Sequence, residues 1–172
     1  MENQNIKKKD KILPATEKSG KYYMKKALAH AEKSKRDGEV PVGAVIVYKG
    51  RIISSGRNSR EKDKDALCHA EINAIRKACK RMGGWRLHEC EMYVTLEPCP
   101  MCAGAIINSR LKRVTIGTKD TRFGCFGGNV DFNTMNFNHK PEIIFGVNDN
   151  SIQEKCSGMM SDFFNSLREK RK

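Results

Sequence analysis

The chain has 172 residues, and 33 Lys or Arg against 20 Asp or Glu give it a formal net charge of +13. This length suits one domain with its own core, and the charge favours an anionic partner such as nucleic acid or a membrane surface. Because no run approaches the roughly 20 apolar residues of a membrane span and the start lacks a signal-peptide core, we expect a cytoplasmic protein outside the membrane.

The first segment, residues 1–20, is polar, rich in lysine and without periodicity, so we expect a flexible basic N-terminal arm. Residues 21–172 are expected to form a single domain. From Tyr22, apolar residues recur near helical spacing until Gly38, which predicts a helix over about 21–37. Basic ends of this kind are equally well explained as solvated tails that keep a protein soluble, so charge alone does not identify the partner.

Two strand-like runs follow, at residues 43–48 and 51–55, and Lys49 and Gly50 separate them. A two-residue loop with a glycine is typical of a β-hairpin. After a polar loop that contains Asn58, apolar residues at three- and four-residue steps predict an amphipathic helix from about His69 to Gly83.

The second half of the chain alternates between the two kinds of element. A strand is expected at 91–96, a short apolar helix at 101–108 and another strand at 113–118. Residues 121–140, rich in Gly and Asn, remain unassigned, and a strand near 142–147 and a helix over about 151–171 complete the chain. Such alternation predicts a sheet sandwiched between helices, which is an α/β layer architecture.

Candidate metal ligands lie at the starts of two predicted helices, in the segments CHAEI (68–72) and EPCPMC (97–102). Cys99 and Cys102 are three apart and lie on one helix face, where the helix dipole favours thiolates. His69 adds an imidazole nitrogen, and a mixed nitrogen and sulfur set suits zinc. The motif spacing provides three ligands only, so we expect water in the fourth position, as in a catalytic zinc site. Glu71, on the same helix turn as His69, is the expected proton shuttle.

A structural zinc site, in a noncatalytic RNA-binding protein, is the main alternative for this cluster. It would need His88 or His139 as a fourth ligand. The remaining cysteines have no partner at ligand spacing, so we expect small buried thiols at Cys68, Cys79, Cys90, Cys125 and Cys156. His30 is expected to be an ordinary surface or packing residue.

The sequence resembles the bacterial tRNA adenosine deaminases of the cytidine and deoxycytidylate deaminase superfamily. The resemblance rests on EVPVGAVIV, Asn58, CHAEINAIR, MYVTLEPCPMCAGAI, SRLKRVTIG and SDFF, in this order, and runs from about Tyr22 to Arg168. It implies a three-layer α/β/α fold around a mixed five-stranded sheet whose last two strands are parallel. It also implies zinc-dependent conversion of the wobble adenosine of a tRNA anticodon to inosine, in a homodimer with one zinc per subunit.

Carried over by motif, the resemblance implies zinc ligation by His69, Cys99 and Cys102, acid and base catalysis by Glu71, and substrate contacts from Asn58 and the amide of Ala70. Such enzymes act on a base that is splayed out of its loop.

The family's anticodon-contacting end corresponds to Phe163, Phe164 and Arg168, although phenylalanines at helical spacing are more often core residues. Asp120 aligns with the substrate loop, where a solvated acid is equally plausible. The chain departs from the family pattern at 127–138 and in its lysine-rich arm, which would strengthen RNA binding by neutralising phosphates. A deaminase of a free base or nucleoside, of guanine or cytosine type, is the alternative function.

Overall fold

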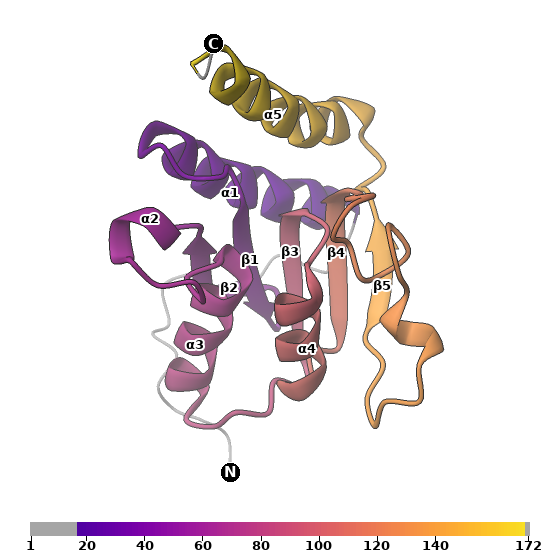
Figure 1. The fold of residues 1–172 in the computed structure, drawn as a ribbon. Coiled ribbons are helices and arrows are strands. Elements are labelled where there is room, and N and C mark those ends of the chain that lie inside the picture. The colour runs from indigo at the N-terminus through magenta and orange to yellow at the C-terminus, as the bar shows by residue number, and fades with distance from the viewer. Residues whose placement is uncertain (1–16, 171–172) are drawn as a thin grey trace.

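A mixed sheet runs through the molecule in the strand order β2-β1-β3-β4-β5 (Figure 1). The computed structural model describes residues 17–170. In this part of the chain the five strands are β1 (Gly43–Tyr48), β2 (Arg51–Arg57), β3 (Cys90–Leu96), β4 (Arg113–Thr118) and β5 (Glu142–Phe145). β1 pairs antiparallel with β2 and β3, whereas β4 is parallel to both β3 and β5. The mixed five-stranded sheet with its last two strands parallel is therefore confirmed.

Helices cover both faces of this sheet (Figure 1). The helices α1 (Glu17–Arg36) and α5 (Asn150–Glu169) pack on one face, and α3 (Ala70–Met82) and α4 (Pro100–Asn108) lie on the other. A single turn, α2 (Arg60–Asp63), follows β2. The predicted α/β architecture, with three layers, is thus the one observed. Across residues 17–170, none of the helices combines the length and hydropathy of a membrane span.

Strand β1, in the middle of the sheet, is apolar on both faces, and a helical layer covers each face. Its side chains alternate between two core clusters, with Ala44 and Ile46 facing one and Val45 and Val47 facing the other. Side chains of successive strand residues point to opposite faces, so a strand between two layers is apolar throughout. The run GAVIV is buried from end to end for this reason.

The hairpin is formed as predicted. Lys49 and Gly50 both have positive φ, at 47° and 72°, as a tight turn between twisted strands requires. β2 continues to Arg57, two residues beyond the expected end, and its last two residues, Gly56 and Arg57, pair with β1. A Cβ at Gly56 would lie 1.9 Å from the carbonyl oxygen of Ala70, so only glycine allows this approach of strand and helix.

Side chains of α3 cover the outer edge of β2, which is an edge strand of the sheet. Alternate β2 carbonyl groups accept hydrogen bonds from three residues spaced by four along α3, so the edge is occupied by side chains. The donors are Asn73 to the Arg57 oxygen at 3.0 Å, Lys77 to Ser55 at 3.0 Å and Arg81 to Ile53 at 3.1 Å.

The remaining differences from the sequence prediction concern boundaries and one loop. α1 begins at Glu17, so the last four residues of the expected arm are helical, and residues 1–16 lie outside the described part of the chain. β5 ends at Phe145, because Gly146 turns the chain with a φ of 79°. The segment 121–140 contains the turn Phe132–Thr134 of 3-10 helix and one β-bridge, Phe126 to Asp131.

Candidate metal and catalytic site

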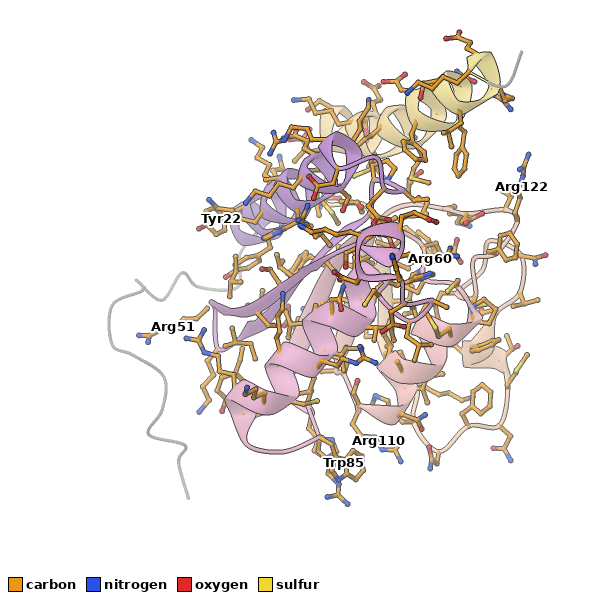
Figure 2. The ribbon with its side chains drawn as sticks, turned by 60° about the vertical axis from the view of Figure 1, so that its left-hand side comes forward. Tyr22, Arg51, Arg60, Trp85, Arg110 and Arg122 are labelled. Atoms are coloured by element: carbon orange, nitrogen blue, oxygen red, sulfur yellow. The ribbon has the colours of Figure 1, made fainter. Side chains whose placement is uncertain are left out.

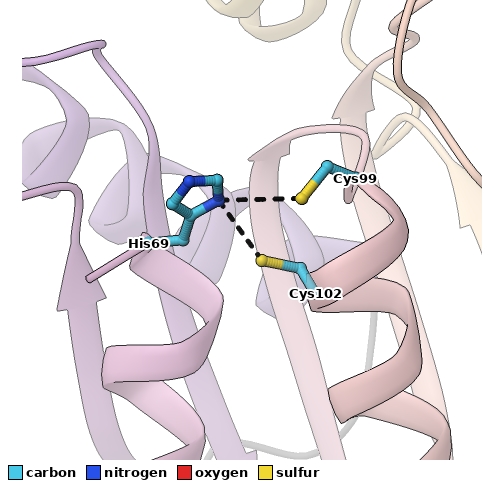
Figure 3. Close-up of side chains that lie close together, drawn as sticks. All are labelled: His69, Cys99 and Cys102. Carbon is cyan, nitrogen blue, oxygen red and sulfur yellow. Dashed lines mark hydrogen bonds between the residues drawn. The ribbon is translucent and has the colours of Figure 1, made fainter. Parts of the chain in front are cut away.

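Two helices of the same layer, α3 and α4, begin side by side at one end of the sheet (Figure 3). His69 and Cys99 occupy the positions just before these helices, with extended backbone, and Cys102 lies in the first turn of α4. Pro100 starts α4, where its fixed φ and missing amide hydrogen are tolerated. Both helix dipoles therefore point their positive ends toward the same space, which favours thiolates there.

The three predicted ligands converge on that space. The Nδ1 atom of His69 lies 3.7 Å from Cys99 Sγ and 3.5 Å from Cys102 Sγ (Figure 3). Tetrahedral zinc with ordinary bond lengths would separate a nitrogen and a sulfur ligand by about 3.6 Å. The three atoms lie within 4.8 Å of one another, so the arrangement fits one zinc ion.

The two sulfur atoms differ in their electrostatics. Hydrogen bonds from Cys102 and His69 lower the pKa of Cys99 to about 4, which makes it a thiolate at neutral pH. The contact with Cys99, together with burial, raises the pKa of Cys102, and Cys99 also raises the pKa of His69. Metal binding deprotonates coordinating thiols, so a zinc ion would hold both sulfur atoms as thiolates.

Glu71 lies in the first turn of α3, two residues after His69, and only 4% of its surface is exposed. Burial raises the pKa of its carboxyl group to about 6. The side chain also lies within hydrogen-bonding range of Cys102. A carboxyl group that titrates near neutrality beside a metal site is suited to take up and release protons during a reaction.

Within residues 17–170, no fourth His, Cys, Asp or Glu joins this cluster. His88 is exposed, and His139 contacts the carbonyl oxygen of Leu111 at 2.7 Å. The remaining cysteines behave as small packing residues, since four of them are buried and Cys79 is half-buried. A structural site that depends on His88 or His139 therefore has no support in the fold.

Asn58 follows β2 directly and lies beside the chain segment that leads into His69. The next residue, Ser59, donates from its amide to the Cys68 carbonyl at 3.0 Å. The side-chain amide of Asn58 donates to Glu39 at 3.3 Å, and Glu39 also accepts from the amide of Lys62 at 2.9 Å. Glu39 is 2% exposed, so a buried carboxylate fixes the orientation of the Asn58 amide.

A second buried carboxylate, Glu97, holds the loop 120–128 against the metal ligands. It accepts hydrogen bonds from the backbone amides of Asp120 at 2.9 Å and of Phe126 and Gly128 at 2.8 Å each. The Asp120 side chain is turned toward its own loop, where it accepts from the amides of Arg122 and Phe123.

Sequence reasoning named Asp120 but missed Glu39 and Glu97. The signal for both was an acid close to a proline in a largely apolar run: Glu39 stands two residues before Pro41 in EVPV, and Glu97 directly before Pro98 in LEPC.

The residues expected at the RNA-contacting end lie on α5, in the opposite layer from α3 and α4. Phe163 is 7% exposed and Phe164 is 44% exposed, and their rings contact edge to face. Arg168 is exposed and hydrogen-bonds to Asn165. Figure 1 shows α5 at the end of the molecule where α3 and α4 begin. The burial of Phe163 marks it as a packing residue.

Comparison with known proteins identifies relatives over most of the chain. Residues 17–118 match the cytidine and deoxycytidylate deaminase zinc-binding region. A tRNA-specific adenosine deaminase of Bacillus subtilis is 46% identical over 151 residues, which are 87% of this chain and 91% of that protein. A tRNA-specific adenosine deaminase of Rickettsia typhi is 43% identical over 148 residues, covering 84% of this chain and 97% of the relative.

Solved structures give the same picture. A structure from studies of A-to-I editing by tRNA:A34 deaminases at the wobble position of transfer RNA aligns with a TM-score of 0.76 and 35% identity. The match covers 81% of this chain and 99% of that one. A guanine deaminase from Bacillus subtilis aligns with a TM-score of 0.58 and 33% identity, over 69% of this chain and 86% of the other. The fold is therefore shared with solved deaminases, and residues 17–118 match a zinc-binding deaminase region.

Proposed function

The chain belongs to the cytidine and deoxycytidylate deaminase family and, within it, to the tRNA-specific adenosine deaminases, and we propose that it hydrolyses adenosine to inosine at the wobble position of a tRNA anticodon. The observation that carries this proposal is a set of three ligand atoms within 4.8 Å of one another, with a buried carboxyl group on the adjoining helix turn. Three protein ligands leave a coordination position for a reactant, as in catalytic zinc sites.

His69, Cys99 and Cys102 hold the zinc in this proposal. Bound there, zinc would supply the Lewis acid that makes water a nucleophile at neutral pH. Glu71 takes a proton from the attacking water and gives it to the ring nitrogen beside the attacked carbon. It then takes the remaining proton from the new hydroxyl group on the attacked carbon and gives it to the amine, so that the C–N bond breaks, the carbonyl forms, and adenosine and water become inosine and ammonia.

Once the adenine base is flipped out of the stacked anticodon loop, the donors and acceptors on its edge need hydrogen-bond partners in the protein. Asn58 can supply them, because Glu39 engages one of its N–H groups and leaves the other N–H and the carbonyl oxygen to read a base. The amide of Ala70 lies in the first turn of α3, where amides have no acceptor within the helix. A substrate oxygen or nitrogen in this space would satisfy that amide.

Phe164 and Arg168 are the α5 residues that we propose for contacts with the anticodon loop. An exposed aromatic ring can stack on a base, and a guanidinium group can meet a phosphate. Asp120 contributes by shaping the loop 120–128. These contacts distinguish an RNA substrate from a free base, which would need neither of the α5 side chains.

We also propose a cytoplasmic homodimer with one zinc per subunit. Leu67, two residues before the ligand His69, is 47% exposed, and Phe123 in the loop 120–128 is 64% exposed. Burial of these two side chains against a second subunit would remove apolar surface from water. Light scattering and the zinc-to-protein ratio test these two expectations.

The direct test uses an anticodon stem-loop with adenosine at the wobble position. Deamination replaces an amine by oxygen, so mass spectrometry should detect a gain of about one dalton in the RNA. We expect Glu71→Ala to lower turnover by about a hundredfold to ten-thousandfold with zinc retained, since it removes the proton shuttle. Glu61→Ala, at an exposed carboxylate on α2, is the matched control and should keep wild-type turnover.

Unchanged activity of Glu71→Ala would refute the mechanism. The alternative function, deamination of a free base or nucleoside, has support from the similarity to a guanine deaminase at 33% identity. Parallel incubation with free adenosine, cytidine and guanine separates the two functions. Turnover of a free compound without turnover of the stem-loop would replace the RNA substrate in this proposal.

A further inference from the structure

A polar cavity of about 400 Å³ opens at the outer edge of β2, between α1 and α3, away from the metal ligands. Figure 2 turns this edge forward, with α1 above β2 and α3 below it. The groups that matter in its wall are Lys33, Arg36, Arg57, Lys77, His30 and Asp37. None of them belongs to the metal site or to the substrate contacts already proposed.

The charges in this cavity are strongly unbalanced. Four permanent cations face one carboxylate, Asp37, and that carboxylate is engaged by the guanidinium group of Arg57. Burial lowers the pKa of His30, and the charges of Lys33, Lys77 and Arg57 lower it further. Because all three cations act on one ring, their fields overlap inside the cavity. Such a concentration of positive charge favours an anionic ligand.

Protection of the sheet edge explains only part of this cluster. Lys77 donates to the Ser55 carbonyl and so covers the edge of β2 from the side of α3. Lys33 and Arg36 come from the last turn of α1, on the other side of the cavity. Among the described residues neither of them forms an ion pair, so their charges are available to a ligand.

The cavity is connected to the substrate site by the chain itself. Arg57 immediately precedes Asn58, and its carbonyl oxygen accepts the side-chain amide of Asn73, two residues after Glu71. The carbonyl oxygen of Asn58 accepts a hydrogen bond from Ser34 of α1 at 2.9 Å. Arg57, which lines the cavity, and Asn58, which is proposed to contact the substrate, are therefore neighbours in the chain. The backbone carbonyl groups of both are hydrogen-bonded to the flanking helices.

We propose that this cavity binds a backbone phosphate of the RNA substrate, from a nucleotide outside the one that is deaminated. The inference rests on the proposed function, since it deepens the way in which the RNA is held. A guanidinium group can donate two parallel hydrogen bonds to two oxygens of one phosphate, which fixes the orientation of the phosphate. An ammonium group contributes positive charge but does not fix that orientation. Arg36 and Arg57 thus orient the phosphate, and Lys33 and Lys77 neutralise it.

The test compares charge removal inside and outside the cavity, in the zinc-loaded full chain. Fluorescence anisotropy of a labelled anticodon stem-loop gives the Kd over a series of salt concentrations. The cavity variant is Lys33→Gln with Arg36→Gln, which keeps the Ser55 and Asp37 contacts intact. The control is Lys25→Gln with Lys112→Gln, at two exposed positions outside the cavity. Like the cavity variant, it loses two positive charges.

We expect the cavity variant to bind about tenfold more weakly near physiological salt, and its slope of log affinity against log salt to fall by about 1. The control variant should change the Kd by less than about twofold, since it loses no phosphate contact. In turnover assays the KM should rise with the Kd while kcat stays at the wild-type value. Asp37→Asn should tighten binding severalfold, because it removes the one negative charge from the cavity.

Wild-type Kd and salt slope in the cavity variant would overturn the proposal, as would an equal loss in the control variant. Weaker or unchanged binding by Asp37→Asn would count against it in the same way. Thermal unfolding of each variant shows whether a loss of affinity reflects a loss of fold. If the wild-type protein does not deaminate the stem-loop, the proposed function fails. If it does, and the cavity variant binds normally, the phosphate site alone fails.

Discussion

The metal cluster and the loop 120–128 lie side by side, but they are built in different ways. His69, Cys99 and Cys102 are placed by two helix starts, and a spacing of three residues already brings the sulfur atoms to one face. The loop is held by Glu97, whose carboxylate binds amides 23 to 31 residues further along the chain. Chemistry that depends on helix geometry can be inferred from spacing, whereas a contact between distant segments requires the fold.

The largest expected effect is the loss of zinc and activity when one metal-binding side chain of the cluster is replaced. Cys102→Ser replaces a thiolate by a poor zinc ligand at a site with no exposed surface, so we expect zinc and turnover to be lost together. Metal analysis of the purified protein and the stem-loop assay measure both. Cys156→Ala, at a buried cysteine outside the cluster, is the control and should retain zinc. Full zinc content in Cys102→Ser would show that this sulfur is not a ligand.

This contrast also explains how far the sequence could be interpreted. Among residues 17–170, periodicity and turn residues predicted each of the strands and the long helices α1, α3, α4 and α5 within a few residues. The ligands and Glu71 follow from two short motifs. The bracing carboxylates Glu39 and Glu97 could be noticed only as acids near proline, and their roles could not be assigned, because most of their partners are backbone amides, which no residue type marks in the sequence. The burial of Phe163 beside the exposed Phe164 likewise depends on how α5 packs.

The loop should respond to Glu97→Gln with a loss of stability and retention of zinc. The carboxylate is 2% exposed and accepts three amide hydrogen bonds, whereas a glutamine would turn an N–H group toward at least one of these amides. We expect a loss of about 2 to 4 kcal/mol in the free energy of unfolding, the range for a buried charged acceptor that loses a partner. Urea unfolding measures the loss, and hydrogen exchange should show the amides of Phe126 and Gly128 as less protected.

The matched control is Glu142→Gln, at an exposed carboxylate that pairs with Arg113. Exposed ion pairs contribute about 0 to 1 kcal/mol, so its effect should be small. Equal stability of Glu97→Gln and Glu142→Gln would show that the loop does not depend on the buried carboxylate.

A smaller effect is expected from adding one methyl group to the same loop. A Cβ at Gly124 would lie 2.3 Å from Glu97 Cδ and 2.4 Å from the Asp120 carbonyl oxygen. Gly124→Ala should therefore cost about 1 to 3 kcal/mol, as other overpacked sites do. Gly104→Ala, in α4 with open space around its Cβ, should instead stabilise the protein by about 0.5 to 1 kcal/mol. Thermal unfolding of the two variants should give shifts of opposite sign, and shifts of the same sign would remove close packing as the explanation.

The smallest loss of stability should come from Asp120→Asn. This variant distinguishes two roles for the Asp120 side chain, which are holding the loop in shape and contacting the RNA substrate. One oxygen of Asp120 accepts both amide hydrogen bonds, from Arg122 at 2.9 Å and Phe123 at 3.2 Å, and asparagine keeps an oxygen in that place. We therefore expect a loss of less than about 1 kcal/mol in the free energy of unfolding. The KM for the stem-loop should then change less than in Glu97→Gln, because the loop keeps its shape. A large change in KM or kcat with unchanged stability would instead place the Asp120 carboxylate on the RNA, since only a contact made in the complex could be lost without affecting the free protein.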